Sequence, residues 1–325
     1  MKTQEVLHGW GKILTGHKPS LSIEITRECP LRCPGCYAYE DDHISSGINL
    51  RQLQDKKGES LVQGVLEVVD HYRPVHLSIV GGDPLVRFRE LTVLLPLLEQ
   101  RGIHVQVVTS AFREVPKEWA NIEKLNLVVS IDGLQPEHDV RRKPATYDKI
   151  VKNIAGHQVT VHCTITAQMM QRPGYLGDFL EFWCAKEEIK RVWMSIFTPQ
   201  KGASSPEILS AGQRMQAVEE MLFLRRKYPK LDMREGLIKE FLNPPSSPAE
   251  CIFAQTTHTI SADLKSQVVP CQFGGEPDCS QCGCIASMGM AAIGNYEVGM
   301  GVTAGHLFRA SIKIGKAVNR LKRAA

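Results

Sequence analysis

Short apolar segments alternate with amphipathic segments between residues 21 and 229, and this alternation restricts the fold more than any other feature of the chain. The apolar segments are rich in Val and Ile and lie at 21–26, 76–80, 104–108, 125–131, 159–165 and 191–197. The amphipathic segments lie at 59–72, 89–102, 146–157, 177–187 and 211–229. Strands that alternate with helices at roughly 30 residues per unit form parallel sheets covered by helices. The alternation therefore predicts an α/β fold with a parallel sheet.

The chemically distinctive residues follow directly after the predicted strands. A cysteine-rich loop follows the first strand, GGDP at 81–84 follows the second, and Asp132 follows the fourth. In a barrel or partial barrel such positions meet at one face, whereas a doubly wound sheet concentrates them at one crevice. Six strand–helix units with this placement predict a partial (β/α)6 TIM-like barrel.

The cysteines are numerous and unevenly distributed. The N-terminus lacks the apolar core of a signal peptide and no segment reaches the roughly 18 apolar residues of a membrane span, so we expect a cytoplasmic protein. In that compartment ten cysteines are more often metal ligands or catalytic groups than disulfides. Cys163 and Cys184 stand alone in apolar surroundings and are predicted to be core thiols. The net charge of +4 argues against a dedicated nucleic-acid binder.

Three cysteines, Cys29, Cys33 and Cys36, form a CxxxCxxC pattern after the first predicted strand. Iron–sulfur clusters are normally held by four thiolates, so three ligands leave one iron open for a substrate or cofactor. Arg27 and Arg32 flank the loop and either offset the charge of the thiolates or are plain surface cations. Two other interpretations stay open: a redox pair formed by the CPGC segment, and a zinc site with His43 as the fourth ligand.

The pattern resembles the radical S-adenosylmethionine (SAM) enzymes, whose hallmark is CxxxCxxC after the first strand of a partial (β/α)6 barrel. The resemblance implies that Cys29, Cys33 and Cys36 hold a catalytic [4Fe-4S] cluster whose open iron binds SAM. It further implies reductive cleavage of SAM to methionine and a 5′-deoxyadenosyl radical, which abstracts hydrogen from the substrate or adds to it. The expected electron donor is a protein of the flavodoxin or ferredoxin type.

The segment GGDP at 81–84 is similar to the GGEP segment of this family. In the family the glycines let the backbone approach SAM, and the acidic residue lies by its amino group. The resemblance therefore assigns Gly81, Gly82 and Asp83 to the SAM site.

The stretch SIDGLQPEHDVRR at 130–142 is similar to a segment of family members that carry auxiliary clusters. By this resemblance Ser130 and Arg142 would hold the SAM carboxylate, which an arginine fork suits well. Asp132 would lie near the ribose, and Thr166 would belong to the same rim.

One position departs from the family pattern. The residue before the third cysteine is usually aromatic and packs near the adenine, but here it is Gly35, and Tyr37 follows the cysteine. Glycine cannot stack on adenine, so Tyr37 is the candidate for that contact.

A second group of cysteines lies near the C-terminus, and its members are Cys251, Cys271, Cys279, Cys282 and Cys284. The segment resembles the auxiliary-cluster region called SPASM or, in shorter form, twitch, in which a hairpin and a cysteine-rich loop supply the ligands. The resemblance implies one auxiliary [4Fe-4S] cluster held by the first four of these cysteines, with Cys284 as the spare or the substitute. A structural zinc ion is the alternative.

These features divide the chain into four parts. We expect an N-terminal arm at 1–20, the radical SAM partial barrel with its following helices at 21–243, an auxiliary iron–sulfur segment at 244–285, and a glycine-rich linker with a basic amphipathic helix at 286–325. Such a helix either docks on the barrel or lies on an anionic membrane surface.

The sequence therefore predicts a radical SAM enzyme, an oxidoreductase or a transferase, that attacks an unactivated carbon of a small-molecule or lipid-like substrate such as an isoprenoid. A peptide-modifying maturase and a non-enzymatic iron–sulfur or zinc protein used for binding or sensing are the alternatives. The expected location is the cytoplasm, with peripheral contact to the inner face of the membrane if the C-terminal helix binds lipid.

Overall fold

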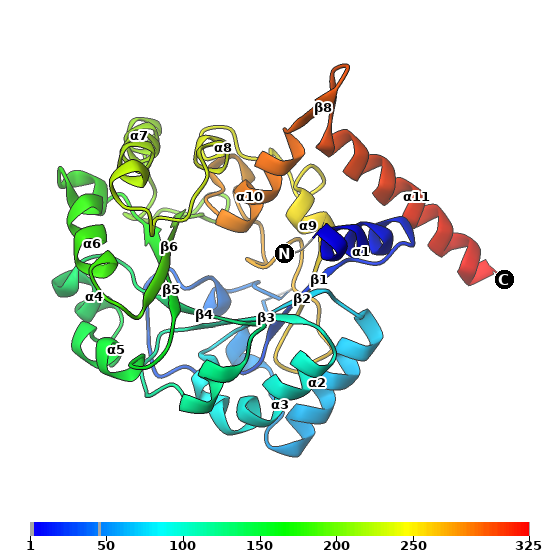
Figure 1. The fold of residues 1–325 in the computed structure, drawn as a ribbon, viewed down its shortest axis with the longest axis horizontal. Helices are drawn as coiled ribbons and strands as arrows, with labels where there is room; N and C mark the ends of the chain where they lie inside the picture. Colours follow the sequence, from blue (N-terminus) through cyan, green and yellow to red (C-terminus); the bar gives the residue numbers. More distant parts are fainter. Residues whose placement is uncertain (1–2, 45–46, 325) are drawn as a thin grey trace.

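The computed structural model describes residues 3–44 and 47–324, so residues 1–2 of the expected arm and residue 325 of the expected tail lie outside the described residues. One sheet of seven parallel strands, in the order β6-β5-β4-β3-β2-β1-β7, curves into an open arc (Figure 1). The strands are β1 (Ser20–Glu24), β2 (His76–Val80), β3 (His104–Thr109), β4 (Leu125–Ser130), β5 (Val159–Ile165), β6 (Ile189–Ile196) and β7 (Thr257–Ile260). The predicted α/β partial barrel is confirmed.

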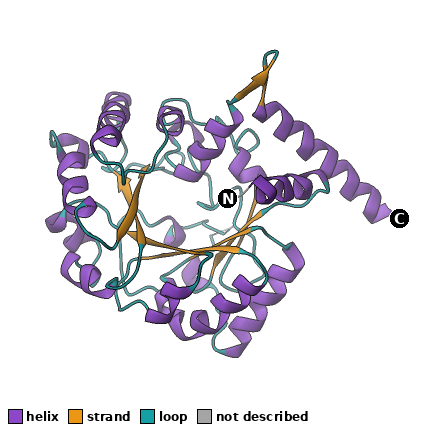
Figure 2. Ribbon diagram, in the orientation of Figure 1, coloured by secondary structure: helices purple, strands orange, loops and turns teal. Residues whose placement is uncertain are grey.

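Helices cover the outer, convex side of this arc, as the colouring by secondary structure shows (Figure 2). The five amphipathic segments named from the sequence form α2 (Glu59–Tyr72), α3 (Phe88–Gln100), α5 (Tyr147–Asn153), α6 (Tyr175–Cys184) and α7 (Ala211–Lys227). The remaining helices are α1 (Thr3–Leu14), α4 (Gln135–Arg141), α8 (Glu235–Glu240), α9 (Ile252–Thr256), α10 (Ile285–Gly294) and α11 (Ala304–Ala324).

The two faces of the sheet differ in polarity, which the near-continuous apolar pattern of the strands did not predict. Outward side chains such as Leu77 and Val105 are buried in the main core beneath the helices. Inward side chains are largely polar and form hydrogen bonds across strands: Asn126 Nδ2 donates to Gln106 Oε1 at 3.3 Å, and a ring nitrogen of His162 lies 2.8 Å from Ser195 Oγ. The inner face is polar because it lines the interior of a partial barrel and is not covered by a second layer of helices.

The seventh strand, β7, was not predicted, because its residues were assigned to a hairpin of the second cysteine segment. It pairs in parallel with β1, and residues beyond it turn back only as far as an isolated bridge between Ile260 and Gln267. The same segment then reaches β6, where Gly283 accepts a hydrogen bond from Ile196 N at 3.0 Å. Residues 257–283 therefore span the opening of the arc and contact the strands on both sides of it.

The N-terminal and C-terminal helices, α1 and α11, pack side by side (Figure 1). The rings of Trp10 and Phe308 lie 4.4 Å apart between centroids, and Trp10 Nε1 donates to Ser311 Oγ at 3.1 Å. Gly315 permits this approach, because a side-chain carbon there would overlap the Ile13 carbonyl. Among the described residues, no helix is long and apolar enough to cross a membrane.

Arg214 of α7 gives a test of how the second cysteine segment is held on the barrel. Its guanidinium is 9% exposed and donates to the carbonyl oxygens of Phe241 at 2.9 Å, Gln281 at 2.6 Å and Cys282 at 3.1 Å. Arg214→Met should lower the free energy of unfolding by about 2–4 kcal/mol, since buried carbonyls lose their donors. Urea unfolding of the metal-free protein measures the change.

The matched control is Arg226→Met on the same helix, because Arg226 is exposed. That variant should change the unfolding free energy by no more than about 0.5 kcal/mol. Equal effects of the two substitutions would contradict the assignment of Arg214 as the residue that holds the segment.

Candidate active site

The carboxyl ends of the strands place the residues singled out from the sequence on one rim. The loop with Cys29, Cys33 and Cys36 follows β1, and Gly81, Gly82 and Asp83 follow β2; Ser130 ends β4, Asp132 comes two residues later, and Thr166 follows β5. Because these strands are parallel neighbours, their carboxyl ends lie along the same edge of the sheet. This rim is the candidate active site.

The three cysteines of the first loop lie close together and are partly shielded from solvent. Burial, with smaller contributions from the nearby Asp83, Cys36 and Cys33, raises the pKa of the Cys29 thiol to about 12. Burial also raises the pKa of Cys33 and of Cys36. Grouped thiols of this kind lose their protons when a cation binds them, so the donor set fits an iron–sulfur cluster.

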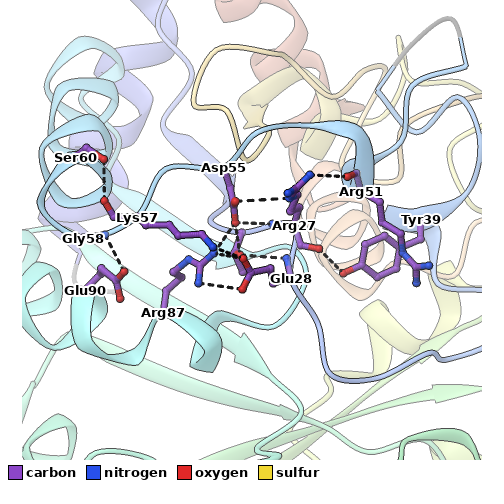
Figure 3. Close-up of polar contacts among 11 residues, drawn as sticks. Arg27, Glu28, Tyr39, Arg51, Asp55, Lys57, Gly58, Ser60, Arg87 and Glu90 are labelled. Carbon is purple, nitrogen blue, oxygen red and sulfur yellow. Dashed lines mark hydrogen bonds and ion pairs between the residues drawn. The ribbon is translucent and has the colours of Figure 1, made fainter.

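A partly buried ion-pair network fixes the backbone that leads into this loop (Figure 3). Arg87, which is 5% exposed, lies 2.8 Å from Asp55 Oδ2 and 2.9 Å from Glu28 Oε1. Lys57 lies 2.6 Å from the same Glu28 oxygen. Hydrogen bonds from Arg87 and Lys57 lower the pKa of Glu28 to about 2. The residue before Cys29 is thereby held in one position.

Arg27 contacts Arg51, Tyr39 and Asp55 in the same view (Figure 3). Its Nη1 donates to the Arg51 carbonyl oxygen at 3.1 Å, and its own carbonyl accepts from Tyr39 Oη at 3.0 Å. Its Nε lies 3.8 Å from Asp55 Oδ1, and the guanidinium of Arg51 lies 4.2 Å from the centroid of the Tyr39 ring. These contacts order the backbone that enters the cysteine loop.

The two glycines after β2 are required by close backbone packing. Gly81 and Gly82 have positive φ angles of 82° and 42°. A side-chain carbon on Gly82 would overlap the carbonyl of Glu28, and one on Gly81 would overlap Glu24. The GGDP turn thus lies directly on the backbone that enters the cysteine loop.

Asp83 is bound on all sides by the protein. It is 2% exposed, and its carboxylate accepts from Thr109 Oγ1 at 2.6 Å, Leu85 N at 3.0 Å, Ser110 N at 2.8 Å and Ser110 Oγ at 2.5 Å. A carboxylate has about four acceptor sites, and these four bonds use them. Asp83 therefore joins the end of β2 to the end of β3. This structural role differs from the role beside SAM that the sequence predicts.

Two adjacent arginines meet the carboxylate that follows β4. Arg142 Nη2 lies 2.7 Å and Arg141 Nε lies 3.3 Å from Asp132 Oδ2, and Asp132 is 3% exposed. Burial alone would raise the pKa of Asp132, but Arg142 and Arg141 outweigh it and lower the pKa to about 2. Both arginines also favour the thiolate form of Cys33. These two arginines are therefore cations that stabilise negative charge on the first cysteine loop.

Sequence reasoning missed Arg141 and its partner Glu207. Arg141 forms an ion pair with Glu207, which is 5% exposed, and its Nη2 donates to the Pro34 carbonyl oxygen at 3.0 Å. Arg141 thereby connects α4, the loop after β6 and the turn between Cys33 and Cys36. No local pattern marks this contact, because the three segments are far apart along the chain.

The surroundings of Gly35 leave no room for a side chain. Its φ is 61°, and a side-chain carbon there would lie 2.7 Å from Glu207 Oε2 and 3.1 Å from Cε2 of Phe197. Phe197 directly follows β6 and is 9% exposed. An aromatic ring from another strand therefore lies beside the position where the family pattern has an aromatic residue.

Tyr37, the candidate named from the sequence for that contact, lies on the side of the second cysteine group. Its ring packs edge-on against Phe273 with centroids 5.2 Å apart. Burial raises its pKa, and Glu24, Cys36, Cys284 and Cys271 add to the effect because all four lie nearby. Tyr37 thus lies between the two cysteine groups.

His43 is excluded as a zinc ligand because both of its ring nitrogens have protein partners. Nε2 lies 2.6 Å from Glu24 Oε1, and Nδ1 lies 2.9 Å from the Phe273 carbonyl oxygen. Glu24 also accepts from Ser261 Oγ at 2.5 Å. Burial alone would lower the pKa of His43, but the bonds to Glu24 and Phe273 raise it. These contacts fasten the first loop to the second cysteine segment.

All five cysteines of the second group line one cavity. Burial raises the pKa of Cys271, Cys279 and Cys282, and neighbouring thiols of the group, including Cys251, add to the effect because these four lie near one another. Cys284, 5% exposed, neighbours three of them and accepts from Gln272 Nε2 at 3.2 Å. The remainder of the lining is largely apolar, including Phe253 and Ala254. A set of buried and partly buried thiols around one cavity fits an iron–sulfur or zinc site.

The two isolated cysteines have different surroundings. Cys163 on β5 is 1% exposed and is a core thiol, as predicted. Cys184, the last residue of α6, is only partly buried but packs against the same core. The prediction of a core thiol therefore holds only in part for Cys184.

The sequence and the fold are similar to those of known proteins. Residues 23–170 match the family described as the Radical SAM superfamily. The chain is 25% identical over 221 residues to Fe-coproporphyrin III synthase of Methanosarcina barkeri, an alignment that covers 65% of this chain and 52% of that protein. The chain thus spans about half the length of this curated relative.

Solved structures share the fold. SuiB of Streptococcus suis bound to S-adenosylmethionine aligns over 80% of this chain and 60% of SuiB, with a TM-score of 0.54 and 16% identity. SuiB bound to the precursor peptide SuiA gives a TM-score of 0.55. The enzyme anSMEcpe with bound AdoMet aligns over 84% of this chain and 76% of its own, with a TM-score of 0.58 and 14% identity.

Asp132 predicts a pH dependence of stability. Its pKa of about 2 lies below the value of about 3.9 for an unfolded aspartate, so its contribution is present above pH 4 and is lost as the pH falls toward 2. Asp132→Asn should therefore flatten the loss of stability between pH 4 and pH 2. Urea midpoints of the metal-free protein across this range measure the slope. Identical slopes for both proteins would contradict the ion pairs described here.

Proposed function

We propose, from the premise that this chain belongs to the radical SAM superfamily, that it is an enzyme that cleaves SAM reductively at the first cysteine loop. The observation that carries the proposal is the position of Cys29, Cys33 and Cys36 on the rim of the partial barrel, beside the GGDP turn and the Arg141–Arg142 pair. The same arrangement argues against a protein that only binds or senses metal, because such a protein would need no rim to receive a second ligand.

The three thiolates would hold a [4Fe-4S] cluster with one open iron. When bound, the cluster and SAM together supply a 5′-deoxyadenosyl radical, which abstracts hydrogen from an unactivated carbon or adds to it. The chain's own residues shape the space around them. Gly81 and Gly82 offer backbone without side chains.

The SAM carboxylate is proposed to bind near Ser130 and the free edge of Arg142. The Nε and Nη2 atoms of Arg142 face Asp132, so Nη1 is the part of the fork that remains for a ligand. Asp132 holds the guanidinium of Arg142 in place. Its proposed contribution near the ribose is this positioning of Arg142. Thr166, 4% exposed at the end of β5, belongs to the same rim.

The adenine contact is proposed to come from Phe197. Its ring lies beside Gly35, where a family member with an aromatic residue before the third cysteine would place its own ring. Tyr37 is less suited, since it is packed against Phe273.

The second cysteine group is proposed to hold one auxiliary [4Fe-4S] cluster on Cys251, Cys271, Cys279 and Cys282, with Cys284 as the spare. The likeness of the chain to the radical SAM superfamily supports iron over zinc at this group.

Two substrate classes follow from different observations. A peptide or another polar molecule is supported by the polar inner face of the barrel and by the likeness to SuiB, a protein solved with the precursor peptide SuiA bound. A lipid-like substrate such as an isoprenoid is supported by the basic amphipathic character of α11. Stimulation of 5′-deoxyadenosine formation by a peptide pool or by a lipid extract separates the two. A cytoplasmic location and a flavodoxin- or ferredoxin-type electron donor belong to the same proposal.

Reductive cleavage is tested with Cys33→Ala. The anaerobically reconstituted protein with dithionite and SAM should form 5′-deoxyadenosine, and Cys33→Ala should reduce the yield to background, because the cluster loses one of three ligands. The matched control, Cys184→Ala, alters a cysteine outside both groups and should retain the yield. A Cys33→Ala protein that forms as much product as the control would contradict the proposal.

Iron analysis tests the second group independently of activity. The reconstituted protein should hold about eight iron atoms, and a variant with Cys29, Cys33 and Cys36 changed to Ala should hold about four, the content of one cluster. The remaining iron should show the absorbance of a thiolate-bound cluster. Stoichiometric zinc with no iron in that variant would contradict the auxiliary cluster while leaving the first cluster untouched.

A further inference from the structure

The outward face of α11 carries a stripe of apolar side chains, which we call the α11 stripe: Leu307, Ile314 and Leu321. They are 43%, 52% and 72% exposed. Their spacing of seven residues places them on one side of the helix, two turns apart. Aliphatic side chains repeated along one exposed side of a helix are unfavourable in water unless something covers them.

A second exposed side of the helix carries a row of cations, which we call the α11 basic edge: Arg309, Lys313, Lys316 and Arg320. All four are exposed, and their spacing places them on a common side, with the exposed small residues Ala310 and Ala317 between them and the α11 stripe. The sequence of α11 contains no acidic residue. In the part of the chain with described side chains, none of the four forms an ion pair. Lys316 also acts on Lys18, whose pKa is lowered by burial and then by this neighbour.

A third side of the helix fixes the orientation of the other two. Phe308, Ser311 and Gly315 face α1 and are buried against it. The α11 stripe and the α11 basic edge are therefore held outward by packing. Figure 1 shows α11 at the margin of the molecule, with its C-terminal half extending beyond the barrel.

We propose that the α11 stripe and the α11 basic edge together bind an anionic lipid surface. Aliphatic side chains enter the boundary between headgroups and acyl chains, while neighbouring Lys and Arg side chains reach the phosphates. A second copy of this helix fits poorly, because it would bring eight cations together without an acid. A nucleic acid would satisfy the cations and leave the α11 stripe in water. This inference stands on the surface of α11 and goes beyond the proposed chemistry.

Vesicle flotation of the full-length, iron-loaded protein under anaerobic conditions tests the inference. The probes are vesicles of phosphatidylcholine alone and of phosphatidylcholine with phosphatidylglycerol. The protein should float with the anionic vesicles at low salt and detach as salt rises. Changing the α11 basic edge to Glu should weaken binding by about 100-fold or more, since each cation near an anionic surface contributes about fivefold.

The control makes the same change of net charge elsewhere. Lys117, Lys149, Lys152 and Arg226 are exposed on other elements, and their quadruple change to Glu should leave binding within about fivefold of the unmodified chain. Changing the α11 stripe to Ser should weaken binding and make the remainder more sensitive to salt. Circular dichroism confirms that each variant is folded.

Three results would overturn the inference. The first is no flotation of the unmodified chain at low salt. The second is equal loss in the α11 and control variants, which would show a response to net charge alone. The third is a dimer in sedimentation velocity that disappears when the α11 stripe is changed to Ser, which would assign the surface to a second copy. None of these results bears on SAM cleavage, so the two proposals fail separately.

Discussion

The open arc of the sheet is the constraint on which the rest of the structure depends. A parallel sheet that curves without closing leaves unpaired backbone groups on its outermost strands. Here β7 occupies one side by pairing with β1, and Gly283 pairs with Ile196 on the other. Both contacts come from one segment, which also carries the second group of cysteines. The ordering of that segment is therefore part of how the barrel is completed.

This arrangement brings the first cysteine loop and the second cysteine segment into contact. Glu24 on β1 binds His43 from the first loop and Ser261 from the second segment, all three within the protein interior. A buried carboxylate is stable only when its charge and hydrogen bonds are satisfied, so each loop depends on the other for a partner. Tyr37 and Phe273 continue the contact with apolar surface. The first loop and the second segment therefore pack directly against each other, and disorder in one would expose buried polar groups of the other.

The sequence was informative where the signal is local. Apolar periodicity located six of the strands and five outer helices, and the spacing of the cysteines located both groups. It was uninformative where contacts join distant segments. The strand β7 has only four residues, and it pairs with β1, which lies more than 230 residues earlier in the chain. Arg141, Glu207 and Pro34 likewise meet only in the fold. The polarity of the inner face escaped prediction because Ser, Thr and His interrupt the strands without breaking their β character.

Gly35 and Phe197 show how a departure from a family pattern acquires a physical meaning. Considered alone, the glycine removes an aromatic ring from the loop and would weaken the site. Considered with its surroundings, it is the residue that the site permits, because Glu207 and Phe197 fill the space a larger side chain would need. Phe197 directly follows β6, so its ring is positioned by a strand and not by the cysteine loop. An aromatic residue at position 35 would therefore require both Glu207 and Phe197 to move, and the glycine is the consequence of the packing around it.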